Sequence, residues 1–116
     1  MMTVSTEQAT WTDFERVGLR AGTIRRVEQF PEARKPAFKL WIDFGPFGIK
    51  QSSAQITVLY NAAELVGRQV ICATGLGSKR VAGFKSEVLV TGFVREDHAI
   101  VLAVPDSRVA DGSALC

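Results

Sequence analysis

Residues 30–45 read FPEARKPAFKLWIDFG, and they contain the clearest strand pattern of the sequence. Its second half alternates large apolar residues with polar ones, which is the period of a β-strand with one buried face. The inward set is Phe38, Leu40, Ile42 and Phe44. Trp41 falls on the opposite face, and Arg34 and Lys35 stand in the charged loop before the strand. The sequence therefore predicts a strand over 37–44 whose outer face is either covered by other segments or binds a ligand.

A second strand is predicted just before this one, over residues 19–28. Its apolar residues Ile24 and Val27 are three positions apart, which is out of phase for a flat strand with a period of two. We expect either a β-bulge or a strong coiling of the strand near Arg25 and Arg26, because either would bring both apolar side chains to the same face.

Two patterns predict short helices. Thr12-Asp-Phe-Glu15 has the spacing of a capping box, and Gly18 follows at the distance of a helix C-terminus. Asn61-Ala-Ala-Glu64 repeats the capping spacing, and the next residue, Leu65, stands where a buried apolar side chain is expected.

Further strands are predicted over 51–59, 69–76, 86–95 and 99–104. In the first of these, alternation places Val58 on the same face as Ser52, Ala54 and Ile56. Three strands, one short helix and further strands give an all-β fold with short helices. This is the element order of a five-stranded Greek-key barrel of the oligonucleotide/oligosaccharide-binding (OB) type, with N- and C-terminal additions. Residues 1–10 are expected to form a flexible tail, and 11–116 the domain.

The sequence contains no recognisable catalytic constellation, and we predict a protein that is not an enzyme and needs no cofactor or metal. The single histidine, His98, follows two acidic residues at a predicted turn. Cys72 alternates within an apolar strand pattern, which favours a buried, inert thiol. Residues 75–80, GLGSKR, faintly resemble a phosphate loop, but the GxxxxGK[ST] spacing and a following helix are missing. We interpret them as a flexible connection.

The formal net charge is only +2, but the charges are unevenly distributed. Residues 16–39 contain seven basic and two acidic side chains, and residues 79–95 contain four and one. These segments are either a solvated mixed surface or, if they fold side by side, a patch for a polyanion. Cations beside aromatic rings suit unpaired nucleic acid, whereas apolar surface with a polar rim suits an unfolded peptide. Composition does not choose between these ligands.

The 116 residues lack the sequence signals of a membrane or secreted protein, and this predicts the cellular compartment. No apolar run approaches the ~18 residues of a membrane span. The first twelve residues are polar, unlike a secretory signal, and two cysteines do not form a disulfide framework. We therefore expect a cytoplasmic protein with no membrane insertion.

Six motifs carry a resemblance to a known family. They are FERV (14–17), the stretch 30–45, QSSAQI (51–56), ELVGRQV (64–70), KRVAGFKSEVLV (79–90) and VPD (104–106). In combination they closely resemble CsaA-type members of the tRNA-binding-domain family, which also occurs attached to methionyl-tRNA and phenylalanyl-tRNA synthetases. The likeness runs from Phe14 to the C-terminus, nearly the whole chain.

The resemblance implies an OB-fold homodimer whose interface is built by the terminal additions. It also implies an ATP-independent, secretion-linked chaperone that binds unfolded or precursor polypeptides. The wider family implies structure-selective tRNA binding or a scaffold role for an aminoacyl-tRNA synthetase as alternatives. Carried onto the matching positions, the candidate ligand-binding residues are Arg34, Lys35, Ser53, Lys79, Arg80, Ser86 and Glu87.

Three aromatic residues and one loop complete the predicted site. Phe84 either contributes to an apolar peptide-binding surface or anchors its loop. Phe14 and Trp41 are assigned to the dimer interface or the binding face. For Trp41 we favour a structural role, in which its side chain packs against other segments or the partner chain, over contact with a ligand. Residues 75–78 replace the asparagine and prolines common in the family, which is expected to loosen this loop and argues against tRNA binding through it.

Overall fold

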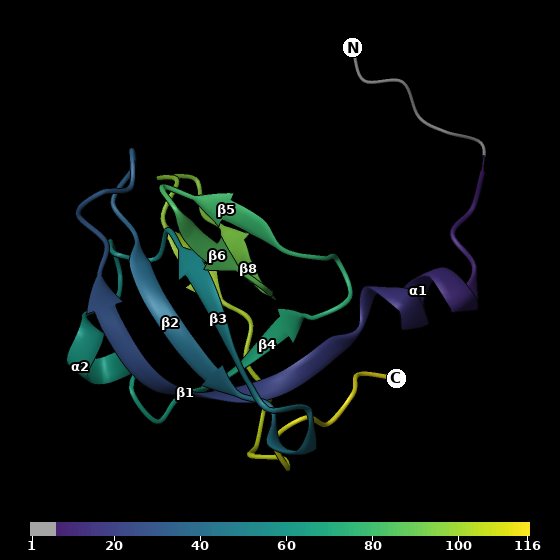
Figure 1. The fold of residues 1–116 in the computed structure, drawn as a ribbon. Helices are drawn as coiled ribbons and strands as arrows, with labels where there is room; N and C mark the ends of the chain where they lie inside the picture. Colours follow the sequence, from purple (N-terminus) through teal and green to yellow (C-terminus); the bar gives the residue numbers. More distant parts are fainter. Residues whose placement is uncertain (1–6) are drawn as a thin grey trace.

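The computed structural model describes residues 7–116, and its strands form a small curved sheet with two short α-helices outside it (Figure 1). In chain order the elements are α1 (Trp11–Val17), β1 (Leu19–Gln29), β2 (Phe38–Asp43), the 3-10 helix η1 (Gly45–Phe47), β3 (Ile49–Ala54), α2 (Ala62–Leu65), β4 (Gln69–Ala73), β5 (Lys79–Val81), β6 (Phe84–Ser86), β7 (Leu89–Val90), β8 (Gly92–Val94) and β9 (Ile100–Leu102).

The main sheet has five antiparallel strands in the order β3-β2-β1-β4-β7. Its two edges approach each other, because Glu87, just before β7, donates its main-chain N–H to the carbonyl of Gln51 in β3 at 2.8 Å. The Ser52 hydroxyl donates to the carbonyl of Val88 at 2.9 Å across the same seam. The result is a nearly closed five-stranded barrel, which confirms the predicted OB-type fold.

Strand β2 supplies much of the barrel interior. Phe38, Leu40, Ile42 and the following Phe44 are all buried, as their alternation predicts. Each such side chain contributes about 1.5–3 kcal/mol of transfer free energy. The strand covers Phe38–Asp43, one residue shorter at each end than predicted.

The predicted β-bulge in β1 is confirmed. Ile24 pairs with Ile42 and Arg26 with Trp41, so Arg25 has no opposite residue. The extra residue lets Ile24 and Val27 both reach the core despite their spacing. Gly22 lies on the same strand where β1 bends over the core. A Cβ atom there would lie 2.7 Å from Ile42 and Phe44 side-chain atoms, so only glycine fits.

Two of the three helix ends predicted above agree with the structure. Gly18 ends α1 in the left-handed conformation, and the Asn61 side chain caps α2 by accepting the N–H of Glu64 at 2.9 Å. Leu65 is buried, as predicted. The predicted cap at Thr12 is wrong, since Thr10 accepts the N–H of Asp13 instead. Both threonines have an acidic residue three positions on, and the earlier pair gives a longer helix.

The later strands differ from the prediction in three ways. Strand β3 ends at Ala54, so the chain has already turned at Val58, which is 75% exposed rather than inward. The segment predicted as one strand over 86–95 is split into β6, β7 and β8. Strands β5 and β6 form a hairpin that was not predicted. Ala82 and Gly83, with φ of 47° and 83°, form its two-residue turn.

The C-terminal segment returns to the start of β1. Gly112 donates its N–H to the carbonyl of Ala21 at 2.7 Å, and Leu115 donates to Leu19 at 3.0 Å. The end of the chain therefore lies on the same side of the barrel as α1 (Figure 1). Of the predicted flexible tail over 1–10, residues 1–6 lie outside the described residues, and Glu7–Ala9 have no helix or strand.

Candidate ligand-binding surfaces

Four of the predicted basic residues belong to two loops at one end of the barrel. Arg34 and Lys35 are exposed in the β1–β2 loop, and Lys79 and Arg80 are exposed on the β5–β6 hairpin (Figure 1). Within residues 7–116 none of these side chains forms an ion pair with a carboxylate. The Arg80 guanidinium donates to the carbonyl of Gly83 in its own turn at 2.9 Å. The fold thus brings part of each basic segment of the sequence to the same end of the barrel.

An aromatic cluster joins these two loops. The Phe84 ring, on the hairpin, lies edge-on to the rings of Phe30 and Trp41, with centroids 5.6 and 5.7 Å apart. The Lys39 ammonium lies 5.2 Å from the Phe84 ring centre and 4.8 Å from that of Phe30. The Arg26 guanidinium lies 4.6 Å from the Trp41 ring. Phe84 therefore anchors the hairpin on the outer face of β2 and partly covers Trp41.

Ser53, Ser86 and Glu87 lie at the seam of the barrel. Ser86 Oγ accepts the N–H of Ser53 at 3.1 Å, and a Glu87 carboxylate oxygen accepts the N–H of Gln51 at 3.1 Å. Ser86 is buried, and the other two side chains are half-buried. These side-chain hydrogen bonds add to the main-chain bond from Glu87 to Gln51 where β3 meets the β6–β7 region. The closing of the barrel thus explains the positions of Ser86 and Glu87, and no ligand is needed to explain them.

An open groove lies between the end of β3 and the β7–β8 segment, and we call it the apolar groove. Its volume is about 660 Å³. Its apolar lining includes Ile56, Leu76, Val88, Leu89 and Ile100, and Ser53, Lys79 and Ser86 of the predicted site line it as well. Leu76 and Leu89 are 59% and 54% exposed. Sequence reasoning missed both leucines, although a leucine between Gly75 and Gly77 in a polar connection was a usable signal.

Phe14 lies on α1, far along the chain from the groove residues. None of the α1 residues is buried, and Trp11 is 87% exposed while Phe14 is 39% exposed. This helix is therefore an amphipathic element whose aromatic side chains are only partly covered by the described residues. The assignment of Phe14 and Trp41 to a dimer interface stays a prediction.

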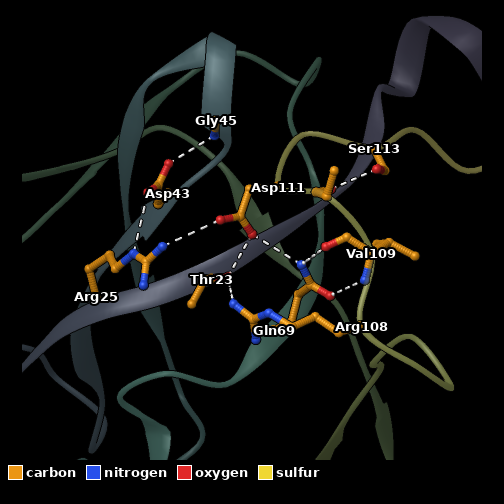
Figure 2. A network of polar contacts seen from close by, with 10 residues as sticks. Thr23, Arg25, Asp43, Gly45, Gln69, Arg108, Val109, Asp111 and Ser113 are labelled. Atoms are coloured by element: carbon orange, nitrogen blue, oxygen red, sulfur yellow. Dashed lines mark hydrogen bonds and ion pairs between the residues drawn. The ribbon is translucent and has the colours of Figure 1, made fainter.

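The C-terminal segment is held on the barrel by Asp111 (Figure 2). One carboxylate oxygen accepts hydrogen bonds from the Thr23 hydroxyl at 2.6 Å and from the Gln69 amide at 3.0 Å. Arg25 lies 3.5 Å from the other oxygen and also pairs with Asp43 at 3.3 Å. Burial alone would raise the pKa of Asp111, but the hydrogen bonds and nearby arginines lower it overall.

Cys72 and His98 lie in very different surroundings, one buried and the other exposed. Burial raises the pKa of the Cys72 thiol to about 12, which keeps it protonated and inert at neutral pH. His98 is exposed at a turn with φ of 67°. Across residues 7–116, no three histidine, cysteine or acidic side chains gather in a way that could hold a metal ion. None of the helices in this range has the length and apolar character needed to cross a membrane.

Comparison with known proteins identifies the family. Residues 19–114 match the model of the tRNA-binding domain. The crystal structure of the chaperone CsaA from Bacillus anthracis is 47% identical, with a TM-score of 0.88 over 95% of this chain and 100% of that one. The CsaA chaperone from Picrophilus torridus is 40% identical, with a TM-score of 0.86 over 94% of this chain and 100% of that one.

Longer proteins contain a related segment. The methionine–tRNA ligase of Porphyromonas gingivalis is 30% identical over 107 residues, which are 92% of this chain. The chain spans only about 15% of the length of that relative. The match therefore concerns one domain of the ligase. The chain belongs to the tRNA-binding-domain family and is similar over almost its whole length to the CsaA chaperones.

Proposed function

We propose that the chain is an ATP-independent molecular chaperone of the CsaA type. It binds unfolded or precursor polypeptides in the cytoplasm before their export, and it acts as a homodimer. The observation that supports this best is the apolar groove, because an open, mainly apolar surface on a small protein is a common mark of a site for another chain. The similarity to two CsaA chaperones over nearly their full length supports the same proposal.

The groove has the chemistry that an extended polypeptide requires. Leu76 and Leu89 expose more than half of their surface and flank an interior lined by Ile56 and Ile100. Because about half of each leucine is still exposed, covering that part by a client side chain gives about 1–1.5 kcal/mol per leucine. Lys79 at the rim leaves a charged group in water beside the apolar lining. Such a site selects apolar character rather than one sequence, as a holding chaperone must.

The proposed dimer rests on α1. Trp11 and Phe14 would leave a large aromatic surface in water if the chain stayed alone. Static light scattering should give twice the chain mass of 12.6 kDa, and Trp11→Ser with Phe14→Ser should shift the protein toward the monomer. A mass of one chain at working concentration would exclude the dimer.

The chaperone proposal is tested by titrating a fluorescently labelled, reduced and unfolded polypeptide with the full chain. Leu76→Ser and Leu89→Ser should each weaken binding about tenfold and reduce suppression of client aggregation. Val66→Ser is the matched control, since Val66 is 51% exposed after α2 and does not line the groove. Equal losses in the control and the groove variants would exclude the groove as the binding site.

A second function, structure-selective tRNA binding, is supported by the family match and by the four cations at one end of the barrel, Arg34, Lys35, Lys79 and Arg80. Their contacts with phosphates would make tRNA affinity fall steeply with salt, whereas peptide binding in the apolar groove should change little. Mobility shifts with tRNA at low and moderate salt, alongside the peptide titration, separate the two functions. Salt-insensitive peptide binding without any tRNA shift would exclude the second.

A scaffold role for an aminoacyl-tRNA synthetase is the third proposal, supported by the methionine–tRNA ligase relatives. It requires that a synthetase copurify with the chain from its own cells. Purification from those cells without a synthetase would exclude this role.

A further inference from the structure

A second cavity opens beside the apolar groove, and we call it the basic pocket. Its volume is about 360 Å³, within the roughly 300–1,000 Å³ of small-molecule sites. Its lining includes Arg20, Phe47, Lys50 and Lys85. Gly77 and Ser78 line both cavities, so the β4–β5 connection separates the basic pocket from the groove. None of the functions proposed above uses this cavity.

The basic pocket carries a surplus of positive charge. Arg20, Lys50 and Lys85 come from β1, β3 and β6, and none of them forms an ion pair within residues 7–116. Glu87 also lines the pocket, but its carboxylate accepts the N–H of Gln51. Three cations therefore face one carboxylate that is already hydrogen-bonded. A cavity with this balance favours an anionic ligand.

Main-chain donors add to this charge. The N–H groups of Gly77 and Ser78 have no hydrogen-bond acceptor in the described part of the chain. Gly77 has φ of +80°, and no atom lies within 4 Å of the place where a Cβ would stand. Free successive N–H groups in such a turn are anion-binding donors. The loop GLGSKR lacks the helix of a phosphate loop, but the fold supplies cations from three other strands.

An aromatic ring completes the pocket. Phe47 is 49% exposed, and the Arg20 guanidinium lies 4.1 Å from its ring centre. Arg20 is held there by a hydrogen bond to the carbonyl of Gly112 at 2.8 Å. The remaining ring surface is open to a flat partner, and every nucleobase has a face that stacks on an aromatic ring.

We propose that the basic pocket binds a nucleoside phosphate. The phosphate lies between Lys50, Lys85 and the N–H groups of Gly77 and Ser78, and the base stacks on Phe47. The ligand is bound without chemical change. It comes either as a free mononucleotide or as the phosphorylated end of an RNA strand, which present the same groups. The proposal does not depend on polypeptide binding in the apolar groove.

Isothermal titration of the full chain with adenosine 5′-monophosphate (AMP) tests the phosphate contacts. Lys50→Gln and Lys85→Gln should each weaken AMP binding about tenfold or more, since each removes a charge-assisted contact. Arg95→Gln likewise removes one positive charge, at an exposed position outside the pocket and outside every site proposed above, and should alter AMP affinity less than about twofold. Unchanged AMP binding in the two pocket variants, or an equal loss in the control, would overturn the proposal. Thermal melting of each variant verifies that it is folded.

The base contact has its own test. Adenosine and ribose 5-phosphate should each bind at least about tenfold more weakly than AMP. Phe47→Leu should weaken AMP binding but leave ribose 5-phosphate unchanged. If ribose 5-phosphate or inorganic phosphate binds as tightly as AMP, the pocket binds a bare anion and the nucleoside assignment is wrong.

A competition experiment then identifies the source of the nucleotide. Displacement of AMP by a short RNA with a 5′-phosphate, but not by the same RNA with a 5′-hydroxyl, assigns the pocket to RNA ends. AMP binding that resists both RNAs assigns it to free nucleotides. Displacement by the 5′-hydroxyl RNA as effectively as by the phosphorylated one would contradict a site built around a terminal phosphate.

Discussion

Replacing Asp111 with alanine removes the carboxylate that holds the C-terminal segment on the barrel. The Thr23 hydroxyl is buried and donates to this carboxylate at 2.6 Å, so it would lose its acceptor. The Gln69 amide would lose a 3.0 Å contact but keep its hydrogen bond to the carbonyl of Val109 at 2.7 Å. Hydrogen bonds to charged groups contribute about 1.5–3 kcal/mol, and the half-exposed Arg25 pair adds little. We expect Asp111→Ala to lower the free energy of unfolding by about 2–4 kcal/mol.

The same carboxylate makes stability depend on pH in a definite direction. The pKa of Asp111 in the folded chain lies below its ordinary value of 3.8. Its stabilising contribution is therefore complete above that value and is lost as the pH falls through the lower, folded value. Asp111→Asn keeps the shape of the side chain but has no charge to titrate. It should therefore lower the free energy of unfolding by about 1 kcal/mol at neutral pH and by less in acid.

Urea unfolding of the wild type, Asp111→Ala and Asp111→Asn at about pH 7, 5 and 3 measures these differences. The gap between wild type and Asp111→Asn should stay constant from pH 7 to 5 and narrow toward pH 3. Thr23→Val, alone and combined with Asp111→Asn, isolates the shared hydrogen bond through a double-mutant cycle. Equal stability of Asp111→Asn and wild type at pH 7, or a gap that does not change with pH, would refute this reasoning.

Two further predictions concern the hairpin and the cysteines. Phe84→Ala removes the ring that covers Trp41, so it should lower the free energy of unfolding by about 1–3 kcal/mol. In a Trp11→Phe background, the fluorescence emission of Trp41 should shift to the red. An unshifted emission spectrum would show that Phe84 does not anchor the hairpin over Trp41. Cys72, with a pKa raised to about 12, should resist iodoacetamide in the native chain while the exposed Cys116 reacts. Mass spectrometry should find one adduct before unfolding and two after it, and two adducts on the native chain would contradict the inert assignment.

The parts of the fold that sequence reasoning predicted are those set by local signals. The alternation in β2 fixes which side chains face inward, and the spacing of Ile24 and Val27 requires the bulge in β1. The cap at Asn61 is equally local, because the side chain and the N–H that it accepts are three residues apart. Each of these features depends on chemistry within one segment.

The features that were missed depend on segments that are distant in the sequence. Strands β5 and β6 are three residues each and largely exposed, so neither gives a hydrophobic period. Their position is fixed by Phe84 against Phe30 and Trp41, a contact that no local pattern encodes. The apolar groove and the basic pocket likewise exist only where β3, the β4–β5 connection and the β6–β7 region meet. The loop 75–80 is the clearest case, since the cations beside it in the basic pocket come from β1, β3 and β6 and not from its own sequence.

The two cavities can be tested separately even though they share a loop. Leu89 lines the apolar groove but not the basic pocket, whereas Lys50 lines the basic pocket but not the groove. Leu89→Ser should therefore weaken peptide binding and leave AMP binding unchanged, while Lys50→Gln should do the reverse. Gly77 and Ser78 line both, so any variant that loses both ligands has displaced the loop rather than removed a contact. The pattern of losses across the two variants thus separates a missing contact from a moved loop, which neither variant alone can do.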